Sequence, residues 1–202
     1  PFKGLFVDKA IRPKKRMPIP LHDLYRVEQQ CGHADDELRW IVAAISDTGC
    51  RMAEIVGLSK TDVRLDGDIP HISIRPRPWR RIKTVSSERD IPLVGSALWG
   101  ITRAYQSTNS EMLFPRYNDG VSTNSNSASA ALSKWLKQQT NPDCTMHSFR
   151  HSFRDRLRAV ECPIELTDAL GGWSTDGIGA AYGQGYSLQL KQKWLSAIVL
   201  KT

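Results

Sequence analysis

The chain has 202 residues, 40% hydrophobic and 24% charged, an ordinary composition for a globular protein with one sizeable core or two small ones. No run of about 18 apolar residues occurs, so the sequence predicts no membrane span, and no signal peptide opens the chain. The formal net charge is +7, with 28 lysines and arginines against 21 acidic residues. This basic excess favours a polyanionic partner such as nucleic acid.

The cysteines do not form a recognisable framework. They are Cys31, Cys50, Cys144 and Cys162. No two have the C-x-x-C spacing of a zinc or redox motif, so we expect reduced thiols rather than disulfides or a metal site.

The first 20 residues are rich in proline and base. A basic cluster is formed by Arg12, Lys14, Lys15 and Arg16. We expect residues 1–20 to be an interdomain linker or basic arm, which is either a solvated tail or a strap along a phosphate backbone. Residues 21–202 are expected to form one folded domain. Because the chain begins at Pro1 without a methionine, we expect it to be part of a longer protein.

Two helices are predicted next. Residues 21–30 fit a short helix, and Asp35 and Asp36 offer an N-cap and first-turn acid for a second helix that Gly49 would end. The apolar face of the second helix is predicted to hold Leu38, Ile41, Val42 and Ile45.

Residues 48–58 read T-G-C-R-M-A-E-I-V-G-L. Ile55 and Leu58 are predicted to be buried, whereas Arg51 and Glu54 are three residues apart on another face. Spacing alone favours a surface salt bridge there, which would contribute little to stability.

From Ile69 the pattern changes to alternation. Residues 71–74, 81–83 and 89–93 read as three short strands of a small, highly basic antiparallel sheet, with a break at 75–79. Lys83 lies near the tip of this sheet, where it is either solvated or reaches into a groove.

Further helices are predicted at 94–106, around 130–136 and at 188–200. The buried positions of the second of these are predicted to be Ala130, Leu132, Trp135 and Leu136. The last helix is predicted to have apolar positions at Leu188, Leu190, Trp194, Leu195 and Ile198. The fold class is therefore mainly α with a small antiparallel β-sheet (α+β).

The segment that begins at Thr145 predicts an amphipathic helix. Phe149, Phe153 and Leu157 recur at i, i+4 and i+8 and form an apolar stripe. A second, basic face is formed by His147, Arg150, His151 and Arg154. Like charges on one helix face repel each other, and an anion bound on that face would remove the repulsion.

Four segments, in order, resemble the catalytic domain of the tyrosine recombinases, the phage integrase family. They are T-G-C-R-M-A-E-I-V-G-L at 48–58, K-T-V-S-S-E-R-D-I-P-L at 83–93, H-S-F-R-H-S-F at 147–153, and L-G-G-W at 170–173 with a tyrosine nine residues after the tryptophan. The resemblance covers essentially the whole chain. Any one segment is a weak signal, but four in this order with compatible spacing are a strong one.

The resemblance implies a set of site residues. The catalytic set would be Arg51, Lys83, His147, Arg150, Trp173 and Tyr182. Glu54 is expected to orient Arg51 or Lys83, and His151 to be a structural helix residue that hydrogen-bonds near the site. Trp173 occupies a position where the family usually has histidine; its indole N–H can donate to a phosphate oxygen but cannot shuttle a proton. Tyr186 is a nearby rival nucleophile, and the spacing favours Tyr182.

The implied activity is metal-independent cleavage and rejoining of DNA through a 3′-phosphotyrosine intermediate, with no cofactor. Arginine suits the non-bridging oxygens of a phosphodiester, and tyrosine can act as nucleophile when a base assists it. The expected partner is double-stranded DNA, with a homotetramer on DNA and a monomer or weak oligomer when free. The family usually has a DNA-binding domain ahead of the catalytic one, and this chain lacks it. We expect a cytoplasmic, nucleoid-associated protein of a bacterial cell, of phage or prophage origin.

Three alternative functions remain at this stage. A type IB topoisomerase shares the chemistry but religates the same strand. A non-catalytic DNA-binding relative would keep the fold alone, and a phosphate-binding regulator would take a small ligand. The final helix is expected either to dock on a neighbouring subunit or to pack on its own core.

Overall fold

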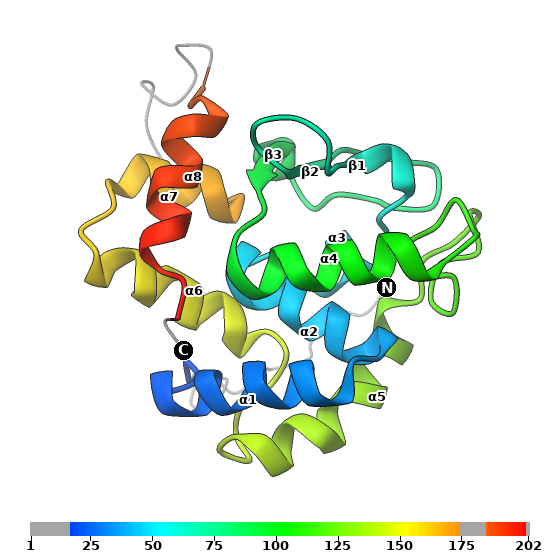
Figure 1. Ribbon diagram of the computed structural model, residues 1–202, viewed down its shortest axis with the longest axis horizontal. Coiled ribbons are helices and arrows are strands. Elements are labelled where there is room, and N and C mark those ends of the chain that lie inside the picture. Colours follow the sequence, from blue (N-terminus) through cyan, green and yellow to red (C-terminus); the bar gives the residue numbers. More distant parts are fainter. Residues whose placement is uncertain (1–16, 174–184, 201–202) are drawn as a thin grey trace, which may run out of the picture.

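The computed structural model describes residues 17–173 and 185–200 (Figure 1). Its α-helices are α1 (Leu21–Ala34), α2 (Glu37–Thr48), α3 (Met52–Val56), α4 (Gly95–Ser107), α5 (Ser125–Gln139), α6 (Ser148–Ala159), α7 (Ile164–Gly171) and α8 (Leu188–Ala197). The strands are β1 (Val63–Arg64), β2 (His71–Ile74) and β3 (Arg89–Pro92), and the short 3₁₀ helices are η1 (Lys60–Asp62) and η2 (Val85–Ser87). Among these described helices, none has the length and hydropathy needed to cross a membrane. The predicted fold class is confirmed.

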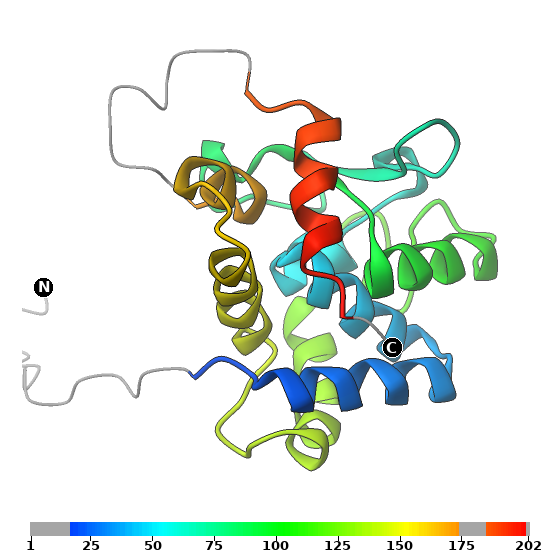
Figure 2. The same ribbon diagram turned by 60° about the vertical axis from the view of Figure 1, so that its left-hand side comes forward.

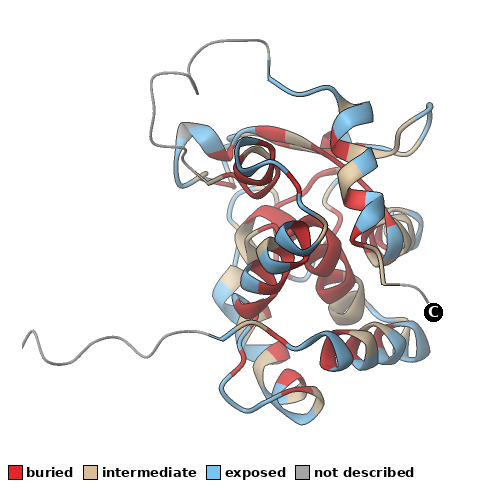
Figure 3. Cartoon of the chain, turned by 90° about the vertical axis from the view of Figure 1, so that its left-hand side faces the viewer, coloured by how far each residue is buried: buried red, intermediate tan, exposed pale blue. Residues whose placement is uncertain are grey.

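Helix α2 is the centre of the fold. The sheet lies toward one end of the molecule and α1 and α5 toward the other, with α2 and α4 between them (Figures 1 and 2). Every residue from Ile41 to Thr48 is buried, because α1, α3, α4 and α6 all contact this helix. Buried residues accordingly gather in the middle of the molecule, as Figure 3 shows. Sites that depend on the end of α2 therefore rest on the most enclosed part of the core.

The predicted caps and stripes of the helices are largely confirmed. Asp36 caps α2, since its side chain accepts a hydrogen bond from the Arg39 amide, and Gly49 ends the helix with φ 61°. Phe149, Phe153 and Leu157 of α6 are completely buried. Full burial of such side chains stabilises the fold by about 1.5–3 kcal/mol each, so α6 is fixed firmly on the core. In α5, by contrast, Ala130 is exposed and Ala128 is buried instead.

The sheet differs from the prediction. Its order is β1-β2-β3, both pairs are antiparallel, and Ile72 of β2 faces Ile91 of β3. The predicted strand at 81–83 is wrong. Arg77 and Arg80 exchange backbone hydrogen bonds of 3.0 Å in a tight turn, and the buried Arg80 side chain pairs with Asp62. This turn takes the chain out of the sheet until β3 begins.

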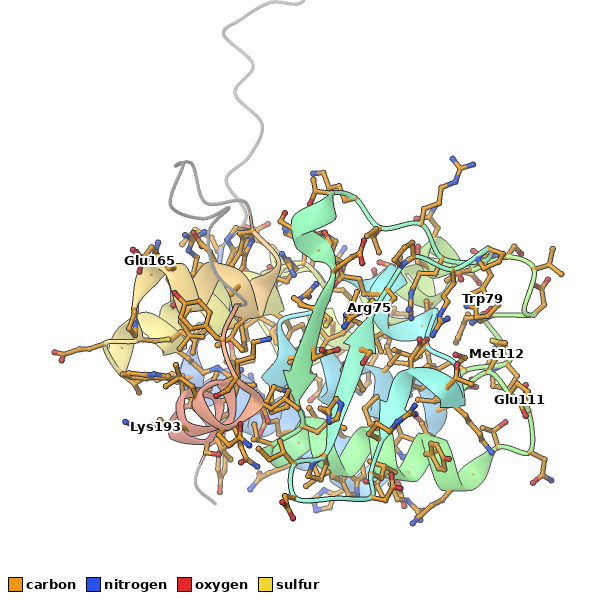
Figure 4. All side chains as sticks on the ribbon, turned by 90° about the horizontal axis from the view of Figure 1, so that it is seen from above. Arg75, Trp79, Glu111, Met112, Glu165 and Lys193 are labelled. Atoms are coloured by element: carbon orange, nitrogen blue, oxygen red, sulfur yellow. The ribbon has the colours of Figure 1, made fainter. Side chains whose placement is uncertain are left out.

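Figure 4 shows the course of the connection between β2 and β3. Arg75 lies where β2 ends, beside β3, and Trp79 lies toward the end of the molecule that also holds Met112. Lys193 of α8 lies at the opposite end. The connection between β2 and β3 thus first leads away from α8, and η2 then returns the chain to the start of β3.

Helix α8 packs on its own chain. Leu195 and Ile198 are buried, and the Lys191 ammonium donates to the Asp90 carbonyl of β3 at 2.9 Å. Burial lowers the pKa of Lys191. The helix ends at Ala197, three residues before the predicted end. Of the two expected arrangements, the described residues adopt packing on the same core.

The end of the predicted arm is anchored as well. Ile19 is buried, its amide donates to the Ser152 hydroxyl at 2.7 Å, and that hydroxyl donates back to the Ile19 carbonyl at 3.1 Å. The four cysteines are free and buried, as expected for thiols.

Candidate active site

Arg51 is held at the start of α3 by the acid three residues later. Its Nη1 donates to Oε1 of Glu54 at 2.6 Å, and its backbone amide donates to Oε2 at 2.9 Å. Nη1 also donates to the Ser87 hydroxyl at 3.1 Å, and Nη2 donates to the Gly172 carbonyl at 3.3 Å. Only 3% of the Glu54 side chain is exposed, so the surface salt bridge predicted from spacing is instead a buried clamp. Arg51 itself remains 24% exposed, so it can still reach a ligand.

Glu54 is charged throughout the physiological range. Burial by itself would raise its pKa, but the nearby charge of Arg89 and hydrogen bonds from Arg89 and Arg51 outweigh burial and lower the pKa to about 2. An ionised carboxylate accepts hydrogen bonds on both oxygens, so Glu54 fixes the direction of the Arg51 fork.

Arg150 lies in the first turn of α6 and is held by backbone carbonyls. Nη2 donates to the Gly171 carbonyl at 3.0 Å, and Nη1 donates to the Gly49 carbonyl. Arg150 is 3% exposed, so the predicted basic face is divided: Arg150 turns inward while His147 and His151 are exposed. Burial and the charge of Arg51 lower the pKa of Arg150 to about 10, so it stays charged at neutral pH.

Trp173 lies against the basic side of α6. The guanidinium carbons of Arg150 and Arg154 are each 4.8 Å from its ring centroid, a cation–π distance. Its backbone amide donates to the Asp168 carbonyl at 3.0 Å, and Arg154 pairs with the Asp168 carboxylate at 2.9 Å. The indole is thereby placed beside the guanidinium group of Arg150.

The two glycines before Trp173 are required by close packing. A Cβ on Gly171 would lie 1.9 Å from the Trp173 ring, and a Cβ on Gly172 would lie 2.6 Å from Nη1 of Arg89. Gly172 also has φ 62°, the left-handed conformation that ends α7. The second glycine of L-G-G-W therefore makes the turn after α7. The sequence prediction missed α7, although Pro163 before it and the glycine after it are helix-boundary signals.

Lys83 is placed near Arg51 by a chain of contacts. It is exposed, and no hydrogen bond or ion pair joins its side chain to a described residue. The next residue, Thr84, shares a 3.1 Å hydrogen bond with the Ser87 hydroxyl, which accepts from Arg51. Two hydrogen bonds, from Thr84 to Ser87 and from Ser87 to Arg51, therefore connect the residue next to Lys83 with Arg51.

The two histidines lie together at the start of α6. The rings of His147 and His151 are 5.4 Å apart at 73°, an edge-to-face arrangement. His147 immediately precedes the helix, and its carbonyl accepts from the Arg150 amide at 3.1 Å. His147 therefore sits one turn before Arg150.

Arg89 is a site residue that the sequence prediction missed. It is the first residue of β3, and its buried side chain donates to Glu54, to the Leu170 carbonyl and to the Ser87 carbonyl. Arg89 stands inside the segment 83–93 that resembles the family, but its strand pattern alone does not indicate a buried partner.

Tyr182, the predicted nucleophile, lies outside the described residues. Of the predicted set, the structure brings together Arg51, Glu54, Arg150 and Trp173, and it places Lys83 and His147 on segments that contact this cluster. Within the described ranges, no three His, Cys, Asp or Glu side chains lie close enough to hold a metal ion.

Solved structures of similar fold are recombinases. XerA recombinase superposes with a TM-score of 0.61 at 16% identity, covering 92% of this chain and 61% of that protein. A lambda integrase tetramer bound to a Holliday junction gives 0.58 at 17% identity, covering 85% and 49%. The lambda integrase catalytic core gives 0.54 at 13% identity, covering 81% and 95%. The chain thus spans about six tenths of XerA but nearly all of an isolated catalytic core.

No curated protein sequence matches the chain significantly. The sequence profile described as the phage integrase family matches residues 22–186, which includes every predicted site residue. This chain therefore belongs to the phage integrase family.

Proposed function

We propose that this chain is the catalytic domain of a site-specific DNA recombinase that cleaves and rejoins strands without a metal ion. The observation that supports it most is the convergence of Arg51 and Arg150 from α3 and α6. Their guanidinium groups are linked by the carbonyls of the adjacent residues Gly172 and Gly171. Two oriented guanidinium forks that are charged at neutral pH are what a phosphodiester with two non-bridging oxygens requires.

The reaction is a pair of transesterifications. The phenolic oxygen of Tyr182 attacks phosphorus while the bond to the 5′ oxygen breaks, which leaves a 3′-phosphotyrosine and a 5′ hydroxyl. The phenolic proton passes to His147, the candidate base, and Lys83 donates a proton to the departing oxygen. A 5′ hydroxyl from the partner duplex then attacks the phosphotyrosine and releases the tyrosine. No net bond energy is lost, so no cofactor is needed.

The arginines and the tryptophan act on the phosphoryl oxygens. Arg51 and Arg150 stabilise the negative charge that grows there, which is the largest contribution in such sites. Trp173 donates its indole N–H to one of these oxygens. Glu54 orients Arg51, and His151 supports His147 through ring contact.

DNA and assembly follow from the same proposal. The similar lambda integrase structure is described as a tetramer on a Holliday junction, and we infer a homotetramer on double-stranded DNA for this protein. Residues 1–20 would be the linker or arm from a preceding DNA-binding domain, and 21–202 the catalytic domain. We further propose that the protein acts in the bacterial cytoplasm, associated with the nucleoid, and that it is of phage or prophage origin.

Two substitutions test the nucleophile. Tyr182→Phe should abolish covalent protein–DNA adducts on a nicked suicide substrate while leaving DNA binding intact, and the matched variant Tyr186→Phe should still form them. An adduct that survives Tyr182→Phe would assign the role elsewhere.

A two-site assay separates the topoisomerase alternative, since only a recombinase exchanges strands between duplexes. A wild-type protein that binds DNA but forms no adduct would be the non-catalytic relative.

A further inference from the structure

Arg89 is buried behind the candidate active site and uses every nitrogen of its guanidinium group. Nε donates to the Leu170 carbonyl at 2.9 Å, Nη1 to the Ser87 carbonyl at 2.7 Å, and Nη2 to Oε2 of Glu54 at 2.9 Å. Its side chain is 3% exposed. A buried arginine must be paired to be tolerated, and the partners of Arg89 all belong to segments that hold Arg51 or Arg150.

Two routes connect Arg89 to Arg51. The first route runs through Glu54, whose carboxylate binds both arginines. Arg51 Nη1 donates to Oε1, and Arg89 Nη2 donates to Oε2. Through Ser87, the carbonyl accepts from Arg89 and the hydroxyl accepts from Arg51. Glu54 and Ser87, which both accept hydrogen bonds from Arg51, are therefore each held by Arg89 as well.

A third route reaches the turn after α7. Arg89 binds the carbonyl of Leu170 and fits closely against Gly172. The next two carbonyls of this turn, those of Gly171 and Gly172, accept from Arg150 and Arg51. One side chain thus fixes the strand, the acid and the turn on which the guanidinium groups of Arg51 and Arg150 depend.

Charge gives Arg89 a second effect. Glu54 alone would neutralise Arg51, and that pair would offer a phosphate little net charge. Arg89 balances Glu54, so Arg51 is oriented without losing its charge to the carboxylate. Its field also reaches Arg150, since burial, Arg51 and Arg89 together lower the pKa of Arg150 to about 10.

We propose that Arg89 is a positioning residue for strand cleavage: it holds Arg51 through Glu54 and Ser87 and keeps the site cationic, without touching the DNA. The inference rests on the proposed function.

The test compares two scissile groups in single-turnover cleavage by the full-length protein. One suicide duplex has the natural phosphodiester, and the other has a methylphosphonate, in which a methyl group replaces one charged oxygen. The uncharged substrate needs less positive charge in the transition state. Loss of a direct donor at a developing oxyanion slows a reaction by about 10²–10³-fold, so Arg89→Met should slow phosphodiester cleavage by about 10- to 100-fold. Methylphosphonate cleavage should slow by less than about 3-fold for at least one stereoisomer.

The matched control is Arg80→Met. Arg80 is another fully buried arginine, and its carboxylate partner is Asp62 rather than Glu54. Its substitution should change both substrates by the same factor. If Arg89→Met does not fold, Arg89→Gln makes the same comparison, because glutamine removes the charge and the fork but keeps a polar side chain.

Equal slowing of both substrates by the Arg89 variants would overturn the inference and leave a structural role only. That result differs from failure of the proposed function, in which the wild-type protein would form no adduct on either duplex.

Discussion

Two groups of three arginines in this chain differ in the number of carboxylates that pair with them. Arg75, Arg77 and Arg80, between β2 and β3, pair with the carboxylates of Asp90 and Asp62. The arginines of the candidate site are Arg51, Arg89 and Arg150, and the carboxylate paired with them is Glu54. Carboxylates neutralise a guanidinium group, whereas the carbonyls of Gly49, Gly171 and Gly172 orient it and leave its charge available for an anion.

A count of basic residues along the sequence would put the anion site between β2 and β3 rather than around Arg51 and Arg150. The sequence predicts a highly basic sheet, but in the structure Arg75, Arg77 and Arg80 of this region are paired with carboxylates. The site that retains net positive charge is assembled from segments about 100 residues apart. Local composition therefore says less about phosphate binding than the number of carboxylates that pair with the arginines.

The largest effect is expected from an arginine held by carbonyls. Arg150→Met should slow single-turnover cleavage by about 10³-fold, because it removes a direct donor to the developing charge. Arg75→Met, which loses an ion pair with Asp90, should stay within about 2-fold of wild type. Comparable losses in the two variants would remove the distinction between the groups.

Lys83 lies in the same connection between β2 and β3, and its proposed role is to protonate the leaving 5′ oxygen. Lys83→Ala should slow cleavage by about 10²-fold, the usual contribution of a general acid. A 5′-bridging sulfur, which leaves without a proton, should restore most of the rate. The exposed neighbour Arg81→Ala is the control and should need no rescue. If the sulfur substrate is slowed as much as the natural one, Lys83 is not the acid.

The single carboxylate of the site predicts a pH dependence of stability. The pKa of Glu54 is lowered from 4.5 to about 2, so its stabilisation is fully present above pH 4.5 and is lost as pH falls toward 2. Glu54→Gln should reduce the free energy of unfolding by about 3 kcal/mol at pH 6, because Arg89 loses its charged partner. The gap to wild type should shrink by about 2 kcal/mol between pH 6 and pH 3 in urea titrations. A constant gap would show that Glu54 is not the ionised partner of the two arginines.

The smallest effect is expected on the salt dependence of DNA binding when an arginine between β2 and β3 is replaced. Each phosphate contact contributes about 0.9 to the slope of log affinity against log salt. Because Arg77 is committed to Asp62, Arg77→Met should leave this slope unchanged. A slope reduced by about one unit would mean that Arg77 leaves its carboxylate and binds the DNA backbone.

Much of the fold could be predicted from local pattern. Helical periodicity gives α6 and its buried stripe of Phe149, Phe153 and Leu157, and the cap residues give both ends of α2. The resemblance to the family gives Arg51, Arg150 and their acidic neighbour. These features depend on residues a few positions apart, which a sequence shows directly.

What could not be predicted depends on contacts distant in sequence. The strand at 81–83 fails because Arg80 is drawn into the core by Asp62. Lys191 and Arg89 look like surface charges in sequence, yet one reaches the Asp90 carbonyl and the other holds Glu54. Tertiary partners decide these side chains, and no local pattern names the partner.

The most direct measurement is a crystal structure of the full-length Tyr182→Phe protein bound to an uncleaved duplex. We expect one phosphate whose non-bridging oxygens accept hydrogen bonds from both Arg51 and Arg150, with the Trp173 indole N–H on the same group and Arg89 still bound to Glu54. A scissile phosphate bound instead by Arg75, Arg77 or Arg80, with Arg51 and Arg150 facing no phosphate, would contradict it.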